Sequence, residues 1–197
     1  MHLVLGLGNP GRRYERTRHN AGFLVVDRLA ERHHVTIERR QLGALVESVR
    51  IGDHPVVLAK PQSFMNLSGQ PAVSLKGWYK VPEDGVVVVH DDVDLPFGDV
   101  RVKAGGGHGG HNGLRDLQEK LGSGAFVRVR CGVGRPPAGH DTADWVLAPF
   151  SAAEEQALPE MVDRAADAVA LVVEMGATVA MNRVNARARP ATGAANQ

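Results

Sequence analysis

The sequence predicts an α/β fold: a single domain built on a twisted, mixed and mostly parallel β-sheet flanked by helices. Short apolar stretches typical of strands alternate along the chain with segments whose apolar residues recur at helical spacing. Two of the strands flank Gly52-Asp53, a turn sequence typical of a β-hairpin, so antiparallel neighbours are expected beside the parallel strands.

The predicted strands are short and rich in β-branched residues. Val86 to Val89 are consecutive valines, which is typical of a buried central strand. The last predicted strand alternates polar and apolar residues and places Arg128 and Arg130 on one face. In chain order, the predicted strands cover residues 3–7, 44–51, 55–60, 86–89, 100–104 and 126–133.

The predicted helices carry apolar residues on one face. Phe23, Val26 and Leu29 form such a face in the first helix, whereas Gly69 and Pro71 interrupt the pattern of the second. In chain order, the predicted helices cover residues 21–32, 66–79, 112–121 and 153–174, and a second short helix follows the last one. Because no linker divides the chain, we expect one domain over residues 1–189 and a disordered tail at 190–197.

The composition is that of an ordinary globular protein, with 197 residues of which 43% are hydrophobic and 23% are charged. The one cysteine, Cys131, allows no intrachain disulfide, which favours a reducing compartment. The first residues do not resemble a secretory leader, and no apolar run is long enough to span a bilayer. We therefore expect a cytoplasmic protein without a membrane partner.

The net charge of +1 conceals an uneven distribution. Basic residues outnumber acidic ones in residues 95–135 and in the loop 12–18, whereas residues 154–174 are acidic. Such asymmetry is typical of a protein that binds a polyanion on one face, although chance clustering on a solvated surface gives the same pattern.

The glycine-rich stretch Gly6-Leu7-Gly8-Asn9-Pro10-Gly11 has the spacing of a dinucleotide-binding loop. In such a loop the helix begins at the third glycine and points its N-terminus at the pyrophosphate. Here the polar residues 12–18 follow instead, and the helical pattern begins only at Ala21. The sequence therefore argues against a nucleotide-binding oxidoreductase.

Polar clusters follow several of the predicted strands. Asn9 follows the first strand, "FMNLSG" at 64–69 follows the hairpin, "HDDVDLP" at 90–96 follows the valines, and "GGGHGGHNGL" at 105–114 follows the strand near Lys103. Open α/β sheets bind ligands at the carboxyl ends of their strands, so these clusters are expected to meet in one cleft.

The residue types in these clusters suit hydrolysis by an activated water molecule. An imidazole such as His19, oriented by a carboxylate, can take a proton from water. The spacing leaves three candidate carboxylates, Asp91, Asp92 and Asp94. Asparagine amides can hold a carbonyl and stabilise its developing negative charge. The candidates for this task are Asn9, Asn66 and Asn112.

Each of these residues also has a purely structural interpretation. His19 and Asn66 are placed where a helix begins and can cap it, and Asp94 precedes Leu95-Pro96 in a turn-forming sequence. His90, His108 and His111 invite a zinc interpretation, but they lack the usual ligand spacing, so no metal is expected.

The longest motifs are "GLGNPG…Y…TRHNAG", "KPQSFMNLSG", "HDDVDLP" and "GGGHGGHNGL". Together they resemble the bacterial peptidyl-tRNA hydrolase family, and "VRVRCGVGRP" and "WVLAPF" extend the resemblance over residues 3–185. The resemblance implies an esterase that cleaves a peptide from the 3′ ribose of tRNA and so recycles tRNA from stalled ribosomes. It also implies a monomeric α/β domain without metal or cofactor.

The resemblance further implies roles for the residues that match the motifs. His19 is the base that activates water, and Asp91 is the carboxylate that keeps it basic. Asn9 helps to distinguish peptidyl from free aminoacyl substrates, and Asn66 and Asn112 hold the peptide backbone and the reacting carbonyl.

The remaining matches concern binding of the substrate. Tyr14 and Phe64 are expected to line the cleft, and Arg101, Lys103 and Arg130 are expected to contact tRNA phosphates. A non-catalytic RNA-binding module would also explain the basic residues, but it would leave the histidine, the aspartate and the asparagines without a task.

Overall fold

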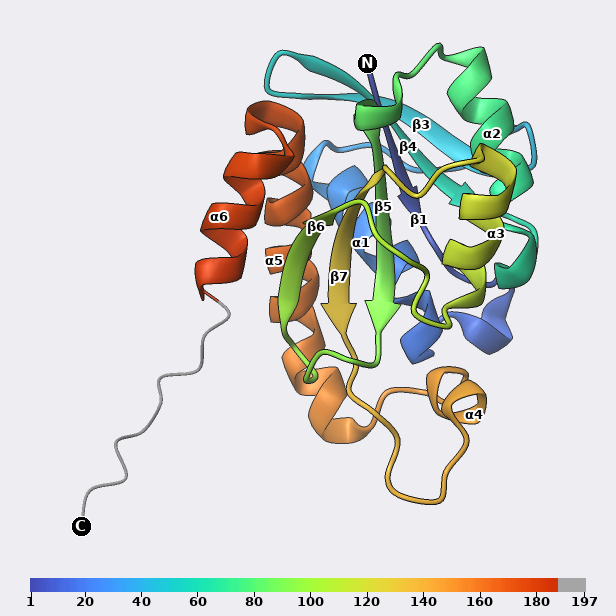
Figure 1. Cartoon of the computed structure of the whole chain (residues 1–197), viewed down its shortest axis with the longest axis vertical. Helices are drawn as coiled ribbons and strands as arrows, with labels where there is room; N and C mark the ends of the chain where they lie inside the picture. Colours follow the sequence, from blue (N-terminus) through green and yellow to red (C-terminus); the bar gives the residue numbers. More distant parts are fainter. Residues whose placement is uncertain (188–197) are drawn as a thin grey trace.

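The computed structural model describes residues 1–187, which form a seven-stranded sheet with helices on both faces (Figure 1). The strands are β1 (His2–Gly6), β2 (Arg39–Gln41), β3 (Ala44–Ile51), β4 (His54–Pro61), β5 (Val86–Asp92), β6 (Val100–Ala104) and β7 (Val127–Gly132). The helices are α1 (Ala21–Arg32), α2 (Gly69–Trp78), α3 (Asn112–Leu121), α4 (Thr142–Val146), α5 (Ala152–Met175) and α6 (Ala177–Arg187). The short 3-10 turns are η1 (Arg12–Tyr14), η2 (Arg18–Asn20), η3 (Met65–Leu67) and η4 (Glu83–Gly85).

The strand order is β2-β3-β4-β1-β5-β7-β6, which confirms the predicted mixed sheet. The four central strands, β4, β1, β5 and β7, are mutually parallel. The flanking strands β2, β3 and β6 pair antiparallel, so the expectation of a mostly parallel sheet is met only in the centre. The predicted hairpin at Gly52-Asp53 joins β3 to β4.

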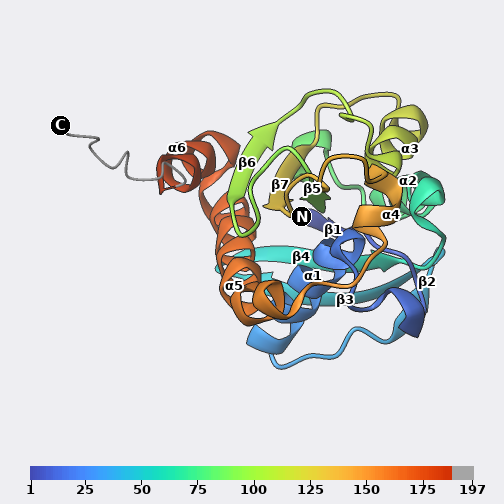
Figure 2. The same cartoon turned by 90° about the horizontal axis from the view of Figure 1, so that it is seen from below.

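The sheet separates two apolar cores, because successive side chains of each strand point to opposite faces. Val4 of β1 joins the core under α1, α5 and α6, whereas Leu3 and Leu5 join the core under α2 and α3. Figure 2 shows these two groups of helices on opposite sides of the strands. The consecutive valines of β5 divide between the two cores in the same way.

Helix α1 begins directly against the ends of β1 and β5. A Cβ atom at residue 22 would overlap the carbonyl oxygen of Val89 and the backbone of Leu7, so only glycine fits there. This close approach brings η2, which immediately precedes α1, to the carboxyl ends of the two strands. The predicted site residue His19 lies in η2.

Several predicted boundaries change in the structure. The helix expected at 66–79 is split at Ser68 into η3 and α2, and α4 and β2 were not predicted. The single domain over 1–189 stays a prediction, and the expected tail at 190–197 lies outside the described residues. Within residues 1–187, none of the helices combines the length and apolar character that crossing a membrane requires.

Candidate active site

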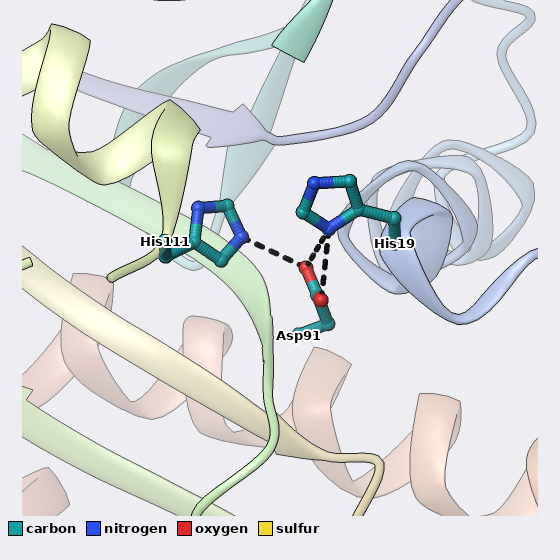
Figure 3. Close-up of side chains that lie close together, drawn as sticks. All are labelled: His19, Asp91 and His111. Carbon is teal, nitrogen blue, oxygen red and sulfur yellow. Dashed lines mark hydrogen bonds and ion pairs between the residues drawn. The ribbon is translucent and has the colours of Figure 1, made fainter. Parts of the chain in front are cut away.

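His19 and Asp91 form the centre of the site (Figure 3). The Nδ1 atom of His19 lies 3.0 Å and 2.9 Å from the two carboxylate oxygens of Asp91. Both side chains are buried, with Asp91 2% and His19 8% exposed. Of the three carboxylates that the sequence left open, Asp91 is therefore the one that contacts His19.

A second histidine contacts the same carboxylate. His111 Nε2 lies 2.8 Å from Asp91 Oδ1, so Asp91 is held between two imidazole rings (Figure 3). The other ring nitrogen of His111, Nδ1, accepts the backbone N–H groups of Gly113 and Leu114 and thereby caps helix α3. Because Nδ1 accepts, Nε2 carries the hydrogen, and His111 is a neutral donor to Asp91.

These contacts also set the tautomer of His19. An ionised Asp91 only accepts hydrogen bonds, so His19 Nδ1 donates to it, and His19 Nε2 remains as the proton acceptor. Burial alone would lower the pKa of His19, but the charge and hydrogen bonds of Asp91 outweigh burial and raise it above 6.5. Burial likewise opposes ionisation of Asp91, yet the two histidines hold its pKa well below the usual range.

Two neighbouring groups are chemically quiet. Burial, followed by the nearby His111, lowers the pKa of His90, whose Nδ1 atom lies 2.7 Å from the backbone oxygen of Asp91. Burial, followed by the charges of Asp91 and Asp92, raises the pKa of Cys131 to about 12. A thiol with that pKa stays protonated at neutral pH and is a poor nucleophile.

A cavity of about 790 Å³ opens above His19 and Asp91. Eight of the predicted site residues line it: His19, Asp91, Asn9, Phe64, Asn66, Asn112, Lys103 and Arg130. Tyr14 and Arg101 are outside its lining in the described part of the chain, and their predicted roles stay predictions. Phe64 exposes 57% of its surface, so the cavity has an apolar rim as well as a polar floor.

The floor of the cavity is fixed by a pair of asparagines. Asn20 donates to the backbone carbonyl of Asn9 and accepts its backbone N–H, both at 2.9 Å. The side-chain oxygen of Asn9 accepts the backbone N–H of Met65 at 2.7 Å. Since that oxygen is engaged, the Nδ2 group of Asn9 is the donor that a ligand carbonyl can meet.

Basic side chains line the cavity along β6 and β7. Lys103 is exposed, and Arg130 donates to Asp92 at 2.8 Å. Arg135 and Arg128, for which no role was predicted, also line the cavity. Arg135 is exposed, whereas Arg128 is buried and donates to the carbonyls of the glycine-rich loop, so only Arg135 extends the basic rim.

The glycine-rich loop at residues 105–111 reaches the site by a route that differs from the predicted one. We expected it to leave the carboxyl end of a parallel strand. Because β6 is antiparallel to β7, its last residue, Ala104, lies instead at the end of the sheet where the parallel strands begin. Residues 105–111 run back along the sheet and deliver His111 to Asp91 (Figure 1). The motif "GGGHGGHNGL" could therefore have indicated that His111 belongs to the site, whereas the predicted strand topology could not.

The histidine cluster differs from the zinc set considered in the sequence analysis. The groups that lie together are His19, Asp91 and His111, whose ligand atoms are within 4.8 Å of one another. Two histidines and a carboxylate can bind a transition metal. In this cluster, however, the facing atoms satisfy each other as donors and acceptor, which is the arrangement of a hydrogen-bonded relay.

Comparisons with known proteins agree with this geometry. The family described as Peptidyl-tRNA hydrolase matches residues 3–192. The chain is 50% identical to the peptidyl-tRNA hydrolase of Nocardia farcinica, over 93% of this chain and 95% of the relative. It is 49% identical to that of Chloroflexus aurantiacus, over 94% of this chain and 99% of the relative.

Solved structures give the same result. The crystal structure of peptidyl-tRNA hydrolase from Acinetobacter baumannii superimposes with a TM-score of 0.88 at 36% identity, covering 94% of this chain and 95% of that one. A peptidyl-tRNA hydrolase solved in complex with N-propanol gives a TM-score of 0.89 at 36% identity, covering 97% of each chain. The chain therefore belongs to the peptidyl-tRNA hydrolase family and is a hydrolase of ester bonds.

Proposed function

We propose that this protein hydrolyses the ester between the C-terminal carboxyl of a peptide and the 3′ ribose of tRNA, with His19 as the general base. The observation that carries the proposal is the contact of His19 Nδ1 with Asp91, which leaves Nε2 free to act in a cavity of about 790 Å³. The family of the chain supports the same substrate.

The reaction needs one water molecule and one proton carrier. His19 Nε2 takes a proton from water while the water oxygen forms a bond to the ester carbonyl carbon. The negative charge of Asp91 stabilises the imidazolium that results, as it does in other carboxylate–histidine pairs. When the bond to the ribose oxygen breaks, that oxygen takes the proton from His19, and the products are a free peptide and a tRNA.

Neutral donors on the cavity lining suit the charge that develops on the carbonyl oxygen. Asn9 offers its Nδ2 group from a fixed position, and Asn66 and Asn112 are exposed on the same lining. One well-placed donor of this kind contributes about 10²–10³-fold to such a reaction. We assign to these residues the binding of the reacting carbonyl and of the adjacent peptide backbone.

The basic rim suits the nucleic acid part of the substrate. Lys103, Arg130 and Arg135 lie on the cavity lining, and phosphate contacts fix the position of a nucleic acid without reading its bases. A protein with this arrangement accepts different tRNAs, as recycling of tRNA from stalled ribosomes requires. We assign to Phe64, on the apolar part of the rim, contact with the peptide part of the substrate.

The decisive experiment measures release of the blocked amino acid from N-acetylaminoacyl-tRNA, with unblocked aminoacyl-tRNA as the control. We expect rapid hydrolysis of the first substrate only. His19→Ala is expected to bind tRNA normally and to lose nearly all turnover, since a general base contributes about 10²–10⁴-fold. Turnover at the wild-type rate in His19→Ala contradicts the assignment, and tRNA binding without release in the wild-type protein favours a non-catalytic RNA-binding module.

A further inference from the structure

Arg18, which directly precedes His19, is a buried arginine with 3% of its surface exposed. Its Nε and Nη2 groups donate to the two carboxylate oxygens of Glu154 at 3.2 Å and 2.8 Å. Its Nη1 group donates to the backbone carbonyl of Trp145 at 3.1 Å, and its guanidinium carbon lies 3.5 Å from the centroid of the Trp145 ring. A buried guanidinium is costly unless its edge and face are both engaged, and here they are.

The segment that Arg18 holds forms one wall of the cavity. Trp145 belongs to α4, and Val146 and Leu147 line the cavity together with His19. A helix of five residues is not stable alone, so tertiary contacts decide where α4 lies. Among the described helices, strands and turns, α4 packs mainly against η2, the turn that carries Arg18.

The carboxylate on the far side of Arg18 is itself fixed. Glu154 accepts the backbone N–H of Ser151 at 2.7 Å and completes the capping box at the start of α5. Helix α5 packs along α1, which continues from η2. Arg18 therefore connects the turn that holds His19 to both the cavity wall and the rigid start of a long helix.

We infer that Arg18 is a positioning residue for the proposed reaction, and that it sets the distance between the α4 wall and His19. The inference rests on the proposed function, because the substrate is what the wall holds. A substrate in contact with α4 presents its ester to His19 only if the two segments keep their relative position. A displaced wall loses contacts that hold the substrate in the ground state and the transition state alike, so the loss is expected in KM.

A neighbouring ion pair provides a matched control. Arg16 pairs with Glu155 of α5, the residue next to Glu154, but its side chain is 55% exposed. Exposed pairs contribute little, so Arg16→Gln is expected to leave KM and kcat within about twofold of wild type. Backbone contacts of this region, such as Phe150 N–H to the Arg16 carbonyl, remain in every variant.

The test uses Trp145 as its own reporter. The chain has two tryptophans, and replacing the exposed Trp78 by Phe leaves Trp145 as the single indole. In this background Arg18→Gln is expected to raise acrylamide quenching of the Trp145 fluorescence. It is also expected to raise KM for N-acetylaminoacyl-tRNA by about tenfold, with kcat changed far less. Arg18→Lys keeps the charge but not the planar guanidinium, so its KM should lie between the values of the wild type and of Arg18→Gln.

The pH profile separates this role from an effect on the base. The contact of His19 with Asp91 does not involve Arg18, so the pH midpoint of kcat/KM is expected to stay at its wild-type value. Unchanged quenching, a wild-type KM or a displaced midpoint in Arg18→Gln each overturns the inference. If Arg18→Gln does not fold, Trp145→Leu decides, because it keeps every charge and should raise KM similarly. A wild-type protein that releases no peptide refutes the proposed function itself.

Discussion

His19 and His111 donate to one buried carboxylate, at 3.0 Å and 2.8 Å from the same Asp91 oxygen. The two imidazoles have different tasks there. His111 is fixed in one tautomer by the N-terminus of α3, whereas His19 keeps a nitrogen free on the cavity side. The arrangement keeps Asp91 ionised and directs its charge at His19.

The first prediction separates the two functions of His111. Asparagine is a good N-cap but is too short to reach Asp91, so His111→Asn keeps the cap and removes the donor. Loss of a hydrogen bond to a buried charge is expected to reduce stability by about 1.5–3 kcal/mol. Because Asp91 then acts on His19 alone, the pH midpoint of kcat/KM should rise, so that kcat/KM at pH 6.5 falls relative to its plateau value.

His111→Ala is the comparison for this experiment. It removes the cap as well and should lose a further ~1 kcal/mol in urea unfolding. Wild-type kcat together with a wild-type pH profile in His111→Asn would show that this histidine serves only the helix.

The second prediction concerns the pH dependence of the reaction. A general base must be unprotonated, and the pKa of His19 is raised above 6.5 by Asp91, so kcat/KM should increase with pH through a midpoint above 6.5. In Asp91→Asn the charge is lost while burial remains, so the midpoint should move below 6.5. Turnover should drop by about 10²-fold, less than in His19→Ala.

An unchanged midpoint in Asp91→Asn, measured from pH 5 to 9 under kcat/KM conditions, contradicts the assignment of Asp91 as the group that raises the pKa of His19. The opposite shifts expected for Asp91→Asn and His111→Asn make the pair of profiles more informative than either alone.

The third prediction concerns the free donor of Asn9. Asn9→Asp keeps the oxygen that accepts the Met65 N–H and replaces the Nδ2 donor by an acceptor. If this donor meets the carbonyl oxygen, kcat/KM of the folded variant should fall by about 10²–10³-fold. In Asn9→Ala the ratio of rates for N-acetylaminoacyl-tRNA and aminoacyl-tRNA should also narrow, and an unchanged ratio removes Asn9 from substrate discrimination.

Much of the fold follows from local patterns. The apolar periodicity gives α1, the central strands and the hairpin because each buries one face or both faces in a core. Local patterns could not decide which of Asp91, Asp92 and Asp94 contacts His19, because the answer depends on where β5 ends. The strand continues to Asp92, and the alternation of side chains puts Asp91 on the face of Val87 and Val89, which is the face that α1 covers.

Residues joined by long-range pairing were the hardest to predict. His111 reaches Asp91 only because β6 reverses direction and residues 105–111 return along the sheet, and no local pattern announces such a reversal. Helix α4 has only five residues, which is too short for a recognisable helical pattern. Its position depends on contacts with residues far away in the sequence, such as Arg18.

The fourth prediction addresses the metal-like grouping of His19, Asp91 and His111. If the three groups act through hydrogen bonds, a chelator selective for transition metals, such as 1,10-phenanthroline, should leave turnover unchanged while Mg²⁺ is kept to maintain the tRNA. Added Zn²⁺ should inhibit, because it competes for the atoms that hold the base in place. Loss of activity with the chelator and recovery with Zn²⁺ would support a catalytic metal instead.

The fifth prediction tests the basic rim. Lys103→Ala and Arg130→Ala each remove one cation from the cavity lining, so each should raise KM for the tRNA substrate and reduce the slope of log KM against log salt by about one. Arg32 is the matched control, since it pairs with Asp163 and Asp167 between α1 and α5 and lies outside the cavity lining of the described residues. Arg130→Ala also leaves Asp92 without its partner, so its effect on KM should exceed that of Lys103→Ala. Slopes equal to wild type in both variants, with the same result for Arg32→Ala, would mean that tRNA phosphates bind elsewhere on the surface.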